Sequence, residues 1–182
     1  MRITGGLTRG RKIYAPKSDK IRVTSDRVRE SLFDILPSME GTLFLDIFAG
    51  TGSVGIEALS RGSAGATFIE KETLHTRTLE KNLKLCGFEK SCELIVSSAE
   101  KGILILSGRR RRFDIVFADP PYDRGLAVET LVLLGKSDLI SRGGVLVIEH
   151  SFREDIVDGN EFVLTDQRRY GDTAISFLKS RI

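Results

Sequence analysis

Four consecutive residues after a short apolar run carry the groups best suited to chemistry in this sequence. Asp119, Pro120, Pro121 and Tyr122 directly follow the run 113–118. The two prolines stiffen the backbone and remove two amide donors, so the groups left facing outward are acceptors, namely the Asp119 carboxylate and the Pro120 carbonyl. Two such acceptors can bind the hydrogens of an amine on an aromatic base, while Tyr122 can stack on the flat base. The motif therefore predicts attack by a base amine on an electrophile.

A second motif is a glycine turn between an apolar run and a helical segment. Gly50, Gly52 and Gly55 follow the run 43–47 with a spacing that lets the backbone turn sharply and approach a ligand closely. Glu70 ends the next apolar run, where a carboxylate can accept the hydroxyls of a ribose. This pattern also matches the fingerprint of a nicotinamide dinucleotide site, so a dehydrogenase is one alternative.

Asp46 indicates whether the ligand at the glycine turn carries a phosphate or an ammonium group. It lies near the end of the first apolar run, four residues before Gly50. A carboxylate there repels a pyrophosphate and attracts an ammonium group. S-adenosylmethionine carries an ammonium, a sulfonium and a ribose but no phosphate, so the sequence favours it over a dinucleotide. The groups that would meet its adenine ring are less specific, and Ser98 and the backbone amide of Ala99 are the candidates.

Alternating apolar runs and helical segments would position both motifs. The runs are 43–47, 66–70, 92–96, 113–118 and 145–149, and the helical segments are 54–61, 73–85, 99–106 and 126–134. Runs that are apolar on both faces and joined by helices are typical of a parallel sheet covered by helices on each side. Because the carboxyl ends of parallel strands share one edge of a sheet, the two motifs should face each other across a small gap.

The two ends of the chain depart from this pattern. A helix is expected to begin at 24–26, where hydroxyl side chains can cap it, and to end before Pro37. Near the other end, 162–164 and 174–178 have the composition of strands and flank turn residues at 170–173. The sequence thus predicts an α/β fold whose sheet is closed by an antiparallel hairpin.

Positive charge is concentrated at the N-terminus. Residues 1–30 hold nine lysines and arginines against three acids, whereas the whole chain has a net charge of +3. A basic arm on a mildly acidic body is expected where one end of a protein meets phosphate. The run Arg109 to Arg112 precedes the strand that leads to Asp119. It should therefore lie on the opposite edge of the sheet, and we interpret it as a solvated loop.

Composition argues against several other classes of protein. No apolar stretch approaches the ~20 residues of a membrane span, and no secretory signal is recognisable. Cys86 and Cys92 form no CxxC pair, which fits a reducing compartment such as the cytoplasm. His75 and His150 are far apart in the sequence, which argues against a zinc site. His150 is interpreted as a packing or hydrogen-bonding residue.

These motifs resemble those of bacterial 16S rRNA guanine-N2 methyltransferases of the RsmD type. The resemblance covers nearly the whole chain and rests on 2–6, 9–11, 22–33, 45–52, 55–62, 119–122 and 170–173. Many amino-methyltransferases share the glycine and Asp-Pro-Pro-Tyr motifs, whereas the arm and the segment 24–30 are more particular to this family. The resemblance implies a basic, hairpin-like arm over 1–23 and a Rossmann-like class I methyltransferase domain over 24–182, with a seven-stranded, mostly parallel sheet.

The same resemblance implies the reaction and the partners. The methyl donor would be S-adenosyl-L-methionine and the acceptor the N2 amine of a guanine in 16S rRNA, met in the small ribosomal subunit by a monomeric, cytoplasmic enzyme without a metal. Two alternatives remain open at this point. An adenine-N6 methyltransferase of DNA could use the same motif, although the chain has no room for a target-recognition domain. A non-catalytic rRNA-binding assembly factor could retain the same fold.

The predicted site residues fall into three groups. Catalysis is assigned to Asp119, Pro120, Pro121 and Tyr122. Cofactor binding is assigned to Thr24, Asp46, Phe48, Ala49, Gly50, Thr51, Gly52, Glu70, Ser98 and Ala99. RNA binding is assigned to Arg2, Arg9, Arg11, Lys12 and Arg22.

Overall fold

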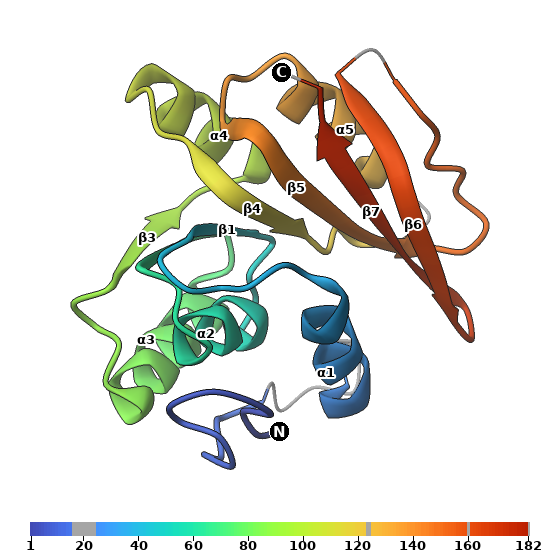
Figure 1. Cartoon of the computed structure of the whole chain (residues 1–182). Coiled ribbons are helices and arrows are strands. Elements are labelled where there is room, and N and C mark those ends of the chain that lie inside the picture. The colour runs from blue at the N-terminus through green and yellow to red at the C-terminus, as the bar shows by residue number, and fades with distance from the viewer. Residues whose placement is uncertain (16–24, 123–124, 160, 182) are drawn as a thin grey trace.

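A seven-stranded sheet forms the centre of the protein (Figure 1). The computed structural model describes residues 1–15, 25–122, 125–159 and 161–181. The strands are β1 (Leu43–Ile47), β2 (Gly65–Glu70), β3 (Cys92–Val96), β4 (Phe113–Ala118), β5 (Ile140–Ser151), β6 (Phe162–Tyr170) and β7 (Thr173–Ser180). They lie in the order β3-β2-β1-β4-β5-β7-β6, and neighbouring strands among β1 to β5 are parallel. Strand β7 is antiparallel to both β5 and β6, so the predicted closing hairpin is confirmed.

Helices cover both faces of the sheet, as the sequence predicted. The helices are α1 (Asp26–Ile35), α2 (Ser53–Ser60), α3 (Thr73–Cys86), α4 (Ala99–Gly108) and α5 (Leu126–Gly135). Figure 1 shows α1, α2 and α3 below the sheet and α4 and α5 above it. Each side has its own apolar core, since α2 and α3 contribute to one buried cluster while α4 and α5 contribute to the other.

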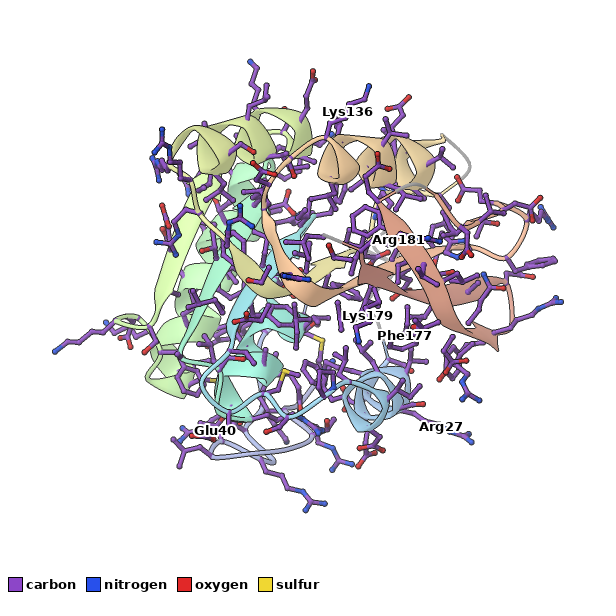
Figure 2. The ribbon with its side chains drawn as sticks, turned by 45° about the horizontal axis from the view of Figure 1, so that its top comes forward. Arg27, Glu40, Lys136, Phe177, Lys179 and Arg181 are labelled. Carbon is purple, nitrogen blue, oxygen red and sulfur yellow. The ribbon has the colours of Figure 1, made fainter. Side chains whose placement is uncertain are left out.

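The central strands supply both cores because successive side chains of a strand point to opposite faces. Phe44 of β1 belongs to the cluster under α1, α2 and α3, and its neighbour Leu45 belongs to the cluster under α4 and α5. Both are buried, which explains why the run is apolar without alternation. In Figure 2 the exposed side chains of Arg27 and Lys136 project outward on opposite sides of the molecule.

The first helix begins as the sequence predicted. The Ser25 side chain caps α1 by accepting a 3.2 Å hydrogen bond from the amide of Val28, and Asp26 occupies the first turn. The helix ends at Ile35, two residues before Pro37. Thr24, assigned above to the cofactor site, lies outside the described residues.

The N-terminal residues fold back on themselves and pack against the body of the protein. Arg2 and Lys12 form an antiparallel bridge, and Ile3 donates its amide to the carbonyl of Arg11 at 3.0 Å. Ile3 and Ile13 are buried in the same cluster as α2 and α3. The described part of the arm is therefore anchored through its own apolar side chains, while the proposed boundary at residue 23 falls outside the described residues.

The strand order brings the carboxyl ends of β1 and β4 together at the centre of the sheet. Connections from β1 lead to β2 on one side, whereas β4 and β5 lie on the other, so the strand order reverses between β1 and β4. Ile47 pairs with Ala118 at the last position of both strands, and Asp46 pairs with Phe117 one position earlier. Open α/β sheets bind ligands at such reversal points.

Of the helices in the described ranges, none combines the length and the apolar character that a membrane span requires.

Candidate functional site

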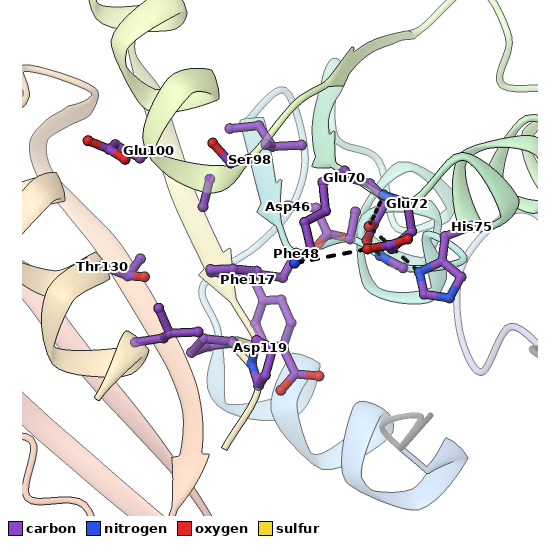
Figure 3. Close-up of a pocket in the computed structure, with 18 of the residues that line it drawn as sticks. Asp46, Phe48, Glu70, Glu72, His75, Ser98, Glu100, Phe117, Asp119 and Thr130 are labelled. Carbon is purple, nitrogen blue, oxygen red and sulfur yellow. Dashed lines mark hydrogen bonds and ion pairs between the residues drawn. The ribbon is translucent and has the colours of Figure 1, made fainter. Parts of the chain in front are cut away.

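A pocket of about 1090 Å³ opens at the carboxyl ends of the central strands. The glycine turn and the Asp-Pro-Pro-Tyr motif both line it, with α5 forming a further wall. The sequence-predicted residues that line this pocket are Asp46, Phe48, Ala49, Gly50, Thr51, Glu70, Ser98, Ala99, Asp119, Pro120, Pro121 and Tyr122. Figure 3 shows Asp119 on one side of Asp46 and Phe48, with Glu70 and His75 on the other. The two motifs thus face one space, as their positions after parallel strands require.

The glycine turn depends on positions where a side chain cannot be accommodated. Gly50 and Gly52 have φ angles of 56° and 78°, in the left-handed region that favours glycine. A Cβ at Gly52 would lie 1.8 Å from Cδ1 of Leu79, and a Cβ at Gly55 would lie 2.3 Å from Cε1 of Phe68. The turn is therefore pressed against α3 and β2. Gly52 itself lines no part of the pocket, so its role is to shape the turn.

Phe48 holds a backbone conformation that is unusual for a bulky residue. Its φ angle is 62°, in the left-handed region, and its side chain lines the pocket. The neighbouring backbone holds this conformation, because the amide of Ala49 donates to the carbonyl of Ile69 at 3.1 Å and that of Asp119 donates to Ile47 at 3.3 Å. Such strain concentrates at ligand sites. No sequence signal marked Phe48 as strained.

Glu70 ties the glycine turn to the end of β2. One carboxylate oxygen accepts the amide of Gly50 at 2.7 Å, and the other accepts the amide of Glu72 at 2.8 Å. His75, in the first turn of α3, places Nδ1 3.6 Å from the second oxygen. A carboxylate with two amide donors is held in a fixed orientation while its remaining lone pairs can accept hydroxyl groups of a ligand.

Asp46 is a buried carboxyl group at the floor of the pocket. Its Oδ2 accepts the amide of Gly55 at 2.9 Å, and only 2% of the residue is exposed. Burial raises the pKa of Asp46 from 3.8 to about 7, the Gly55 amide lowers it, and the nearby charge of Glu70 raises it further. A cationic group bound in the pocket would stabilise the ionised form of Asp46.

The Asp-Pro-Pro-Tyr motif leaves β4 and turns over the pocket. Pro120 is buried, Asp119 is partly buried and Pro121 is exposed. The amide of Asp119 is held by the Ile47 carbonyl, which connects the start of the motif to the end of β1. The motif is thus joined directly to the strand that bears Asp46.

Tyr122 is fixed through its hydroxyl group by two other strands. The hydroxyl donates to Oε1 of Glu149 at 3.1 Å and lies 3.2 Å from Oγ1 of Thr173. Glu149 belongs to β5 and Thr173 begins β7, and both residues are buried. Sequence reasoning missed these two residues, although an acid in the otherwise apolar run 145–149 was a visible signal.

Ser98 and Ala99 lie in the pocket at the start of α4. The Ser98 side chain caps this helix by accepting the amide of Lys101 at 3.4 Å, and Ala99 is partly buried. The adjacent Glu100 also lines the pocket. The structure therefore brings both predicted residues to the site, with the Ser98 hydroxyl already engaged as a helix cap.

Several other residues that line the pocket were not singled out by the sequence analysis, and they come from helices, from β2 and β4, and from the loops that follow β2 and β3. They are Ser53, Val54, Ile69, Lys71, Glu72, His75, Ser97, Glu100, Phe117, Leu126, Val128, Glu129, Thr130, Val132 and Leu133. Those of α5 are mostly apolar, with Glu129 and Thr130 among them. Their spacing in the sequence is that of any amphipathic helix, which predicts burial but not the neighbouring ligand site.

The residues set aside in the sequence analysis lie where they were expected. Arg109 follows α4 and pairs with Glu93 at the amino edge of the sheet, and Arg110 and Arg112 are exposed. His150 is buried between the Ser151 carbonyl and the Ser176 hydroxyl, each at 2.8 Å, and burial lowers its pKa. Within the described ranges, no group of three or more His, Cys, Asp and Glu side chains could hold a metal ion.

The basic residues of the arm differ in their surroundings. Arg2 forms a partly exposed ion pair with Asp26 at 3.7 Å. Arg9, Arg11 and Lys12 are exposed, and the ion pairs found among the described residues do not include them. Arg22 lies outside the described residues.

Comparisons with known proteins agree with this geometry. A family model described as "Conserved hypothetical protein 95" matches residues 1–179. The chain is 31% identical to the "Putative rRNA methyltransferase YlbH" of Bacillus subtilis, covering 100% of both proteins. It is 41% identical to the "Ribosomal RNA small subunit methyltransferase D" of Escherichia coli over 82% of this chain and 74% of that protein. The solved structure of the putative methyltransferase yhhF from Escherichia coli is 34% identical, with a TM-score of 0.86 over 99% of this chain and 97% of that one.

Proposed function

Because this chain belongs to the family described as Conserved hypothetical protein 95 and is an RsmD-type methyltransferase, we propose that it methylates the N2 amine of a guanine in small-subunit rRNA. S-adenosyl-L-methionine is the methyl donor. The observation that carries the proposal is that Asp46, Glu70 and Asp119 line one pocket. The guanine is of the position-966 type that the resemblance implies, and the assembled small subunit in the cytoplasm is the substrate.

The residues at the pocket floor fit this donor. The buried carboxyl of Asp46 suits an ammonium group, because a cation restores the ionised form that burial disfavours. The Glu70 carboxylate, oriented by the amides of Gly50 and Glu72, suits the two hydroxyls of a ribose. Ser98 and Ala99 lie where an adenine ring would follow. The Asp46 carboxyl beside the glycine turn would repel the pyrophosphate of a nicotinamide dinucleotide, which disfavours that ligand.

The donor supplies an electrophilic methyl group on a positively charged sulfur. The protein must make a weakly nucleophilic amine reactive, because the lone pair of a base amine is delocalised into the ring. Asp119 and the Pro120 carbonyl accept the two amine hydrogens, which favours a pyramidal nitrogen with an exposed lone pair. The Asp119 carboxylate also stabilises the positive charge that develops on this nitrogen. Neither role requires a covalent enzyme intermediate.

Tyr122 and the prolines orient the base. The Tyr122 ring lines the pocket while its hydroxyl is held by Glu149 and Thr173, so the ring presents a fixed face for stacking. Pro120 and Pro121 restrict the backbone between Asp119 and Tyr122, which keeps the acceptors and the ring in register. A fixed geometry of this kind lowers the entropic cost of aligning the amine with its electrophile. The pocket, at about 1090 Å³, has room for a flipped base beside the donor.

The arm supplies affinity for RNA. Four cations of the arm are exposed, and all lie on a segment that packs against the body: Arg2, Arg9, Arg11 and Lys12. Arg22 belongs to the same basic segment in the sequence. Cations on a rigid support contact phosphates without sequence preference and release counterions on binding.

Incubation with labelled S-adenosyl-L-methionine and small subunits that lack the modification tests the proposal. We expect label on a guanine, with N2-methylguanosine as the only labelled nucleoside after digestion. In a parallel incubation with DNA, label on N6 of adenine would instead identify the alternative DNA methyltransferase. Binding of subunits without donor binding by calorimetry would identify a non-catalytic assembly factor. Donor-dependent label on protein alone would refute an RNA substrate altogether.

A further inference from the structure

The N-terminal arm carries two exposed apolar side chains among its cations. Leu7 is 86% exposed and Tyr14 is 57% exposed. Residues 1–15 contain four lysines and arginines and no acid. Single exposed apolar residues are common on protein surfaces. Two of them on a short segment whose charged side chains are all cations form a more particular surface.

The backbone beneath Leu7 is locked to the end of α2. The Leu7 amide donates to the Ser60 carbonyl at 2.7 Å, and the Thr8 amide donates to the Ser60 hydroxyl at 3.0 Å. Gly6 has a φ angle of 74°, and a Cβ there would lie 1.8 Å from the Ser60 carbonyl oxygen. The loop therefore touches α2 with its backbone while the Leu7 side chain points away from the protein.

A buried carboxylate reinforces this attachment. Glu57 is fully buried, and its two oxygens accept the amides of Thr4 and Gly5 at 2.8 Å and 2.7 Å. The same oxygens pair with Arg29 at 3.2 Å and Arg61 at 2.9 Å. Fixing the arm in this way lowers the entropy that its exposed side chains would lose on contact with a partner.

The backbone beneath Tyr14 is locked to the cofactor side of the protein. Asn82 of α3 accepts the Tyr14 amide at 2.8 Å and donates to the Tyr14 carbonyl at 3.0 Å. The same side-chain amide donates to the carbonyl of Thr51, in the glycine turn, at 3.0 Å. Tyr14 thus lies one side chain away from the turn that lines the pocket, with most of its ring free to contact a ligand.

We propose that Tyr14 and Leu7 form apolar contacts with unpaired nucleotides of the bound RNA, alongside the phosphate contacts of the arm cations. An alternation of cations with flat or apolar side chains matches a polynucleotide, which alternates phosphates with bases. The position of Tyr14 beside the glycine turn favours RNA over an anionic membrane, because a strand lying on the arm continues toward the pocket. This inference deepens the proposed function and rests on it for the identity of the RNA.

Salt dependence separates the two kinds of contact. Each phosphate contact in a single-stranded complex contributes about 0.7 to the slope of log affinity against log salt, whereas stacking contributes affinity without slope. The full-length protein would be titrated with an unstructured RNA of about 12 nucleotides, long enough for one such binding site. We expect Tyr14→Ala to weaken binding about tenfold, and Leu7→Ala by a smaller factor, with the slope unchanged. Arg9→Ala should reduce the slope by about 0.7.

Matched variants make the outcome decisive. Tyr14→Phe keeps the ring and should bind as wild type, since only the Tyr14 backbone contacts Asn82. Leu104→Ala removes another exposed leucine, 61% exposed on α4 across the sheet, and should change nothing (Figure 1). Wild-type affinity and slope in both Tyr14→Ala and Leu7→Ala would overturn the inference. If Tyr14→Ala lowers the melting temperature, RNA binding is measured with Tyr14→Leu instead, because leucine fills the same surface without an aromatic ring.

Two further outcomes separate this inference from membrane binding and from the proposed methylation reaction. Binding of wild type to phosphatidylserine vesicles, lost in Tyr14→Ala without loss of RNA affinity, would assign the surface to membranes and overturn the inference. Methylation of small subunits is scored independently. If wild type binds the RNA as described but labels no rRNA, the proposed reaction fails while the arm contact stands. If wild type labels rRNA, and Tyr14→Ala and Leu7→Ala bind RNA and label rRNA as wild type does, the arm contact alone fails.

Discussion

The Tyr122 hydroxyl donates a hydrogen bond of 3.1 Å to the buried carboxylate of Glu149. The two residues are 27 positions apart, and the bond joins the loop after β4 to the neighbouring strand β5. A tyrosine anchored by its hydroxyl cannot swing with the loop that carries it. The aromatic face of the Asp-Pro-Pro-Tyr motif is therefore positioned by the sheet as well as by its two prolines.

Removing the Tyr122 hydroxyl should loosen the base without affecting the donor. Tyr122→Phe keeps the stacking ring but loses the bonds to Glu149 and Thr173, each worth about 1 kcal/mol in net terms. We expect turnover to fall about threefold to tenfold, with an unchanged dissociation constant for S-adenosyl-L-methionine. Glu149→Gln is the conservative control, and its turnover should fall less because it retains an acceptor oxygen. Single-turnover methylation measures the turnover, and calorimetry measures the affinity for the donor. Equal losses of turnover and of donor affinity would contradict the role given to Tyr122.

The carboxylate of Asp119 should be required for transfer but not for donor binding. Asp119→Ala removes one of the two acceptors for the amine, and we expect turnover to fall at least about 100-fold, in the range of lost transition-state contacts. The donor should bind as to wild type, because Asp46 and Glu70 are untouched. Asp138→Ala, an exposed acid just before β5, is the matched control. Wild-type turnover of Asp119→Ala would remove Asp119 from the mechanism.

Donor affinity should depend on pH through Asp46. Its pKa is raised to about 7 in the free protein, so the group is mostly protonated at pH 6 and mostly ionised at pH 8. Since an ammonium group binds the ionised form, affinity should increase about tenfold from pH 6 to pH 8. Calorimetric titrations across the range measure the profile, and Asp46→Asn should bind weakly with a flat one. A profile in wild type that falls with pH would show that Asp46 does not bind the cation.

The Glu57 carboxylate should be a main determinant of stability. It is fully buried with Arg29, whose side chain is also fully buried, and it accepts two amides of the arm. Glu57→Gln removes the buried carboxylate that pairs with Arg29 at 3.2 Å, while Asp26 still pairs with Arg29 at 3.0 Å. Breaking a buried pair costs about 3–5 kcal/mol in free energy of unfolding. Urea denaturation should show this loss as a lower midpoint. Glu80→Gln, at an exposed position of α3, should lie within about 0.5 kcal/mol of wild type. A similar midpoint for both variants would mean that solvent or rearrangement compensates for Glu57.

Asn82 should link the arm to the glycine turn. Asn82→Ala removes hydrogen bonds to the partly buried backbone of Tyr14 and to the buried Thr51 carbonyl, and leaving a buried group unsatisfied costs about 1–3 kcal/mol. We expect lower stability, faster amide exchange at Tyr14 and weaker donor binding. Lys81→Ala, at the exposed neighbouring position, serves as the control. Donor affinity equal to that of wild type, together with lower stability, would restrict Asn82 to a structural role.

Much of the fold could be predicted from local patterns. The five apolar runs of the parallel sheet, the helices between them and the hairpin around 170–173 all occur where the sequence indicated. These features are legible because a buried strand must be apolar on both faces, and a turn needs particular residue types. The start of α1 was equally clear, since Ser25 supplies the side-chain cap that its first turn requires.

The arm was only half predictable. Its net charge indicated a contact with phosphate, but charge says nothing about how a segment is held. Thr4 and Gly5 bind Glu57, which lies more than fifty positions away, and Ile3 enters the core under α2 and α3. Contacts between residues so distant in the chain leave no local periodicity, so the sequence could not distinguish an anchored arm from a solvated one.

By itself, the sequence determined which groups could do chemistry and the edge of the sheet on which they lie, because residue type and strand direction are local properties. Asp46 and Glu70 lie at the carboxyl ends of parallel strands and Asp119 directly follows a third, so their presence at one edge is a consequence of topology. Only the tertiary structure decided the left-handed backbone of Phe48, the raised pKa of Asp46 and the anchoring of Tyr122 by Glu149. Each of these depends on neighbours from other strands, whose distance and burial exist only once the sheet has formed.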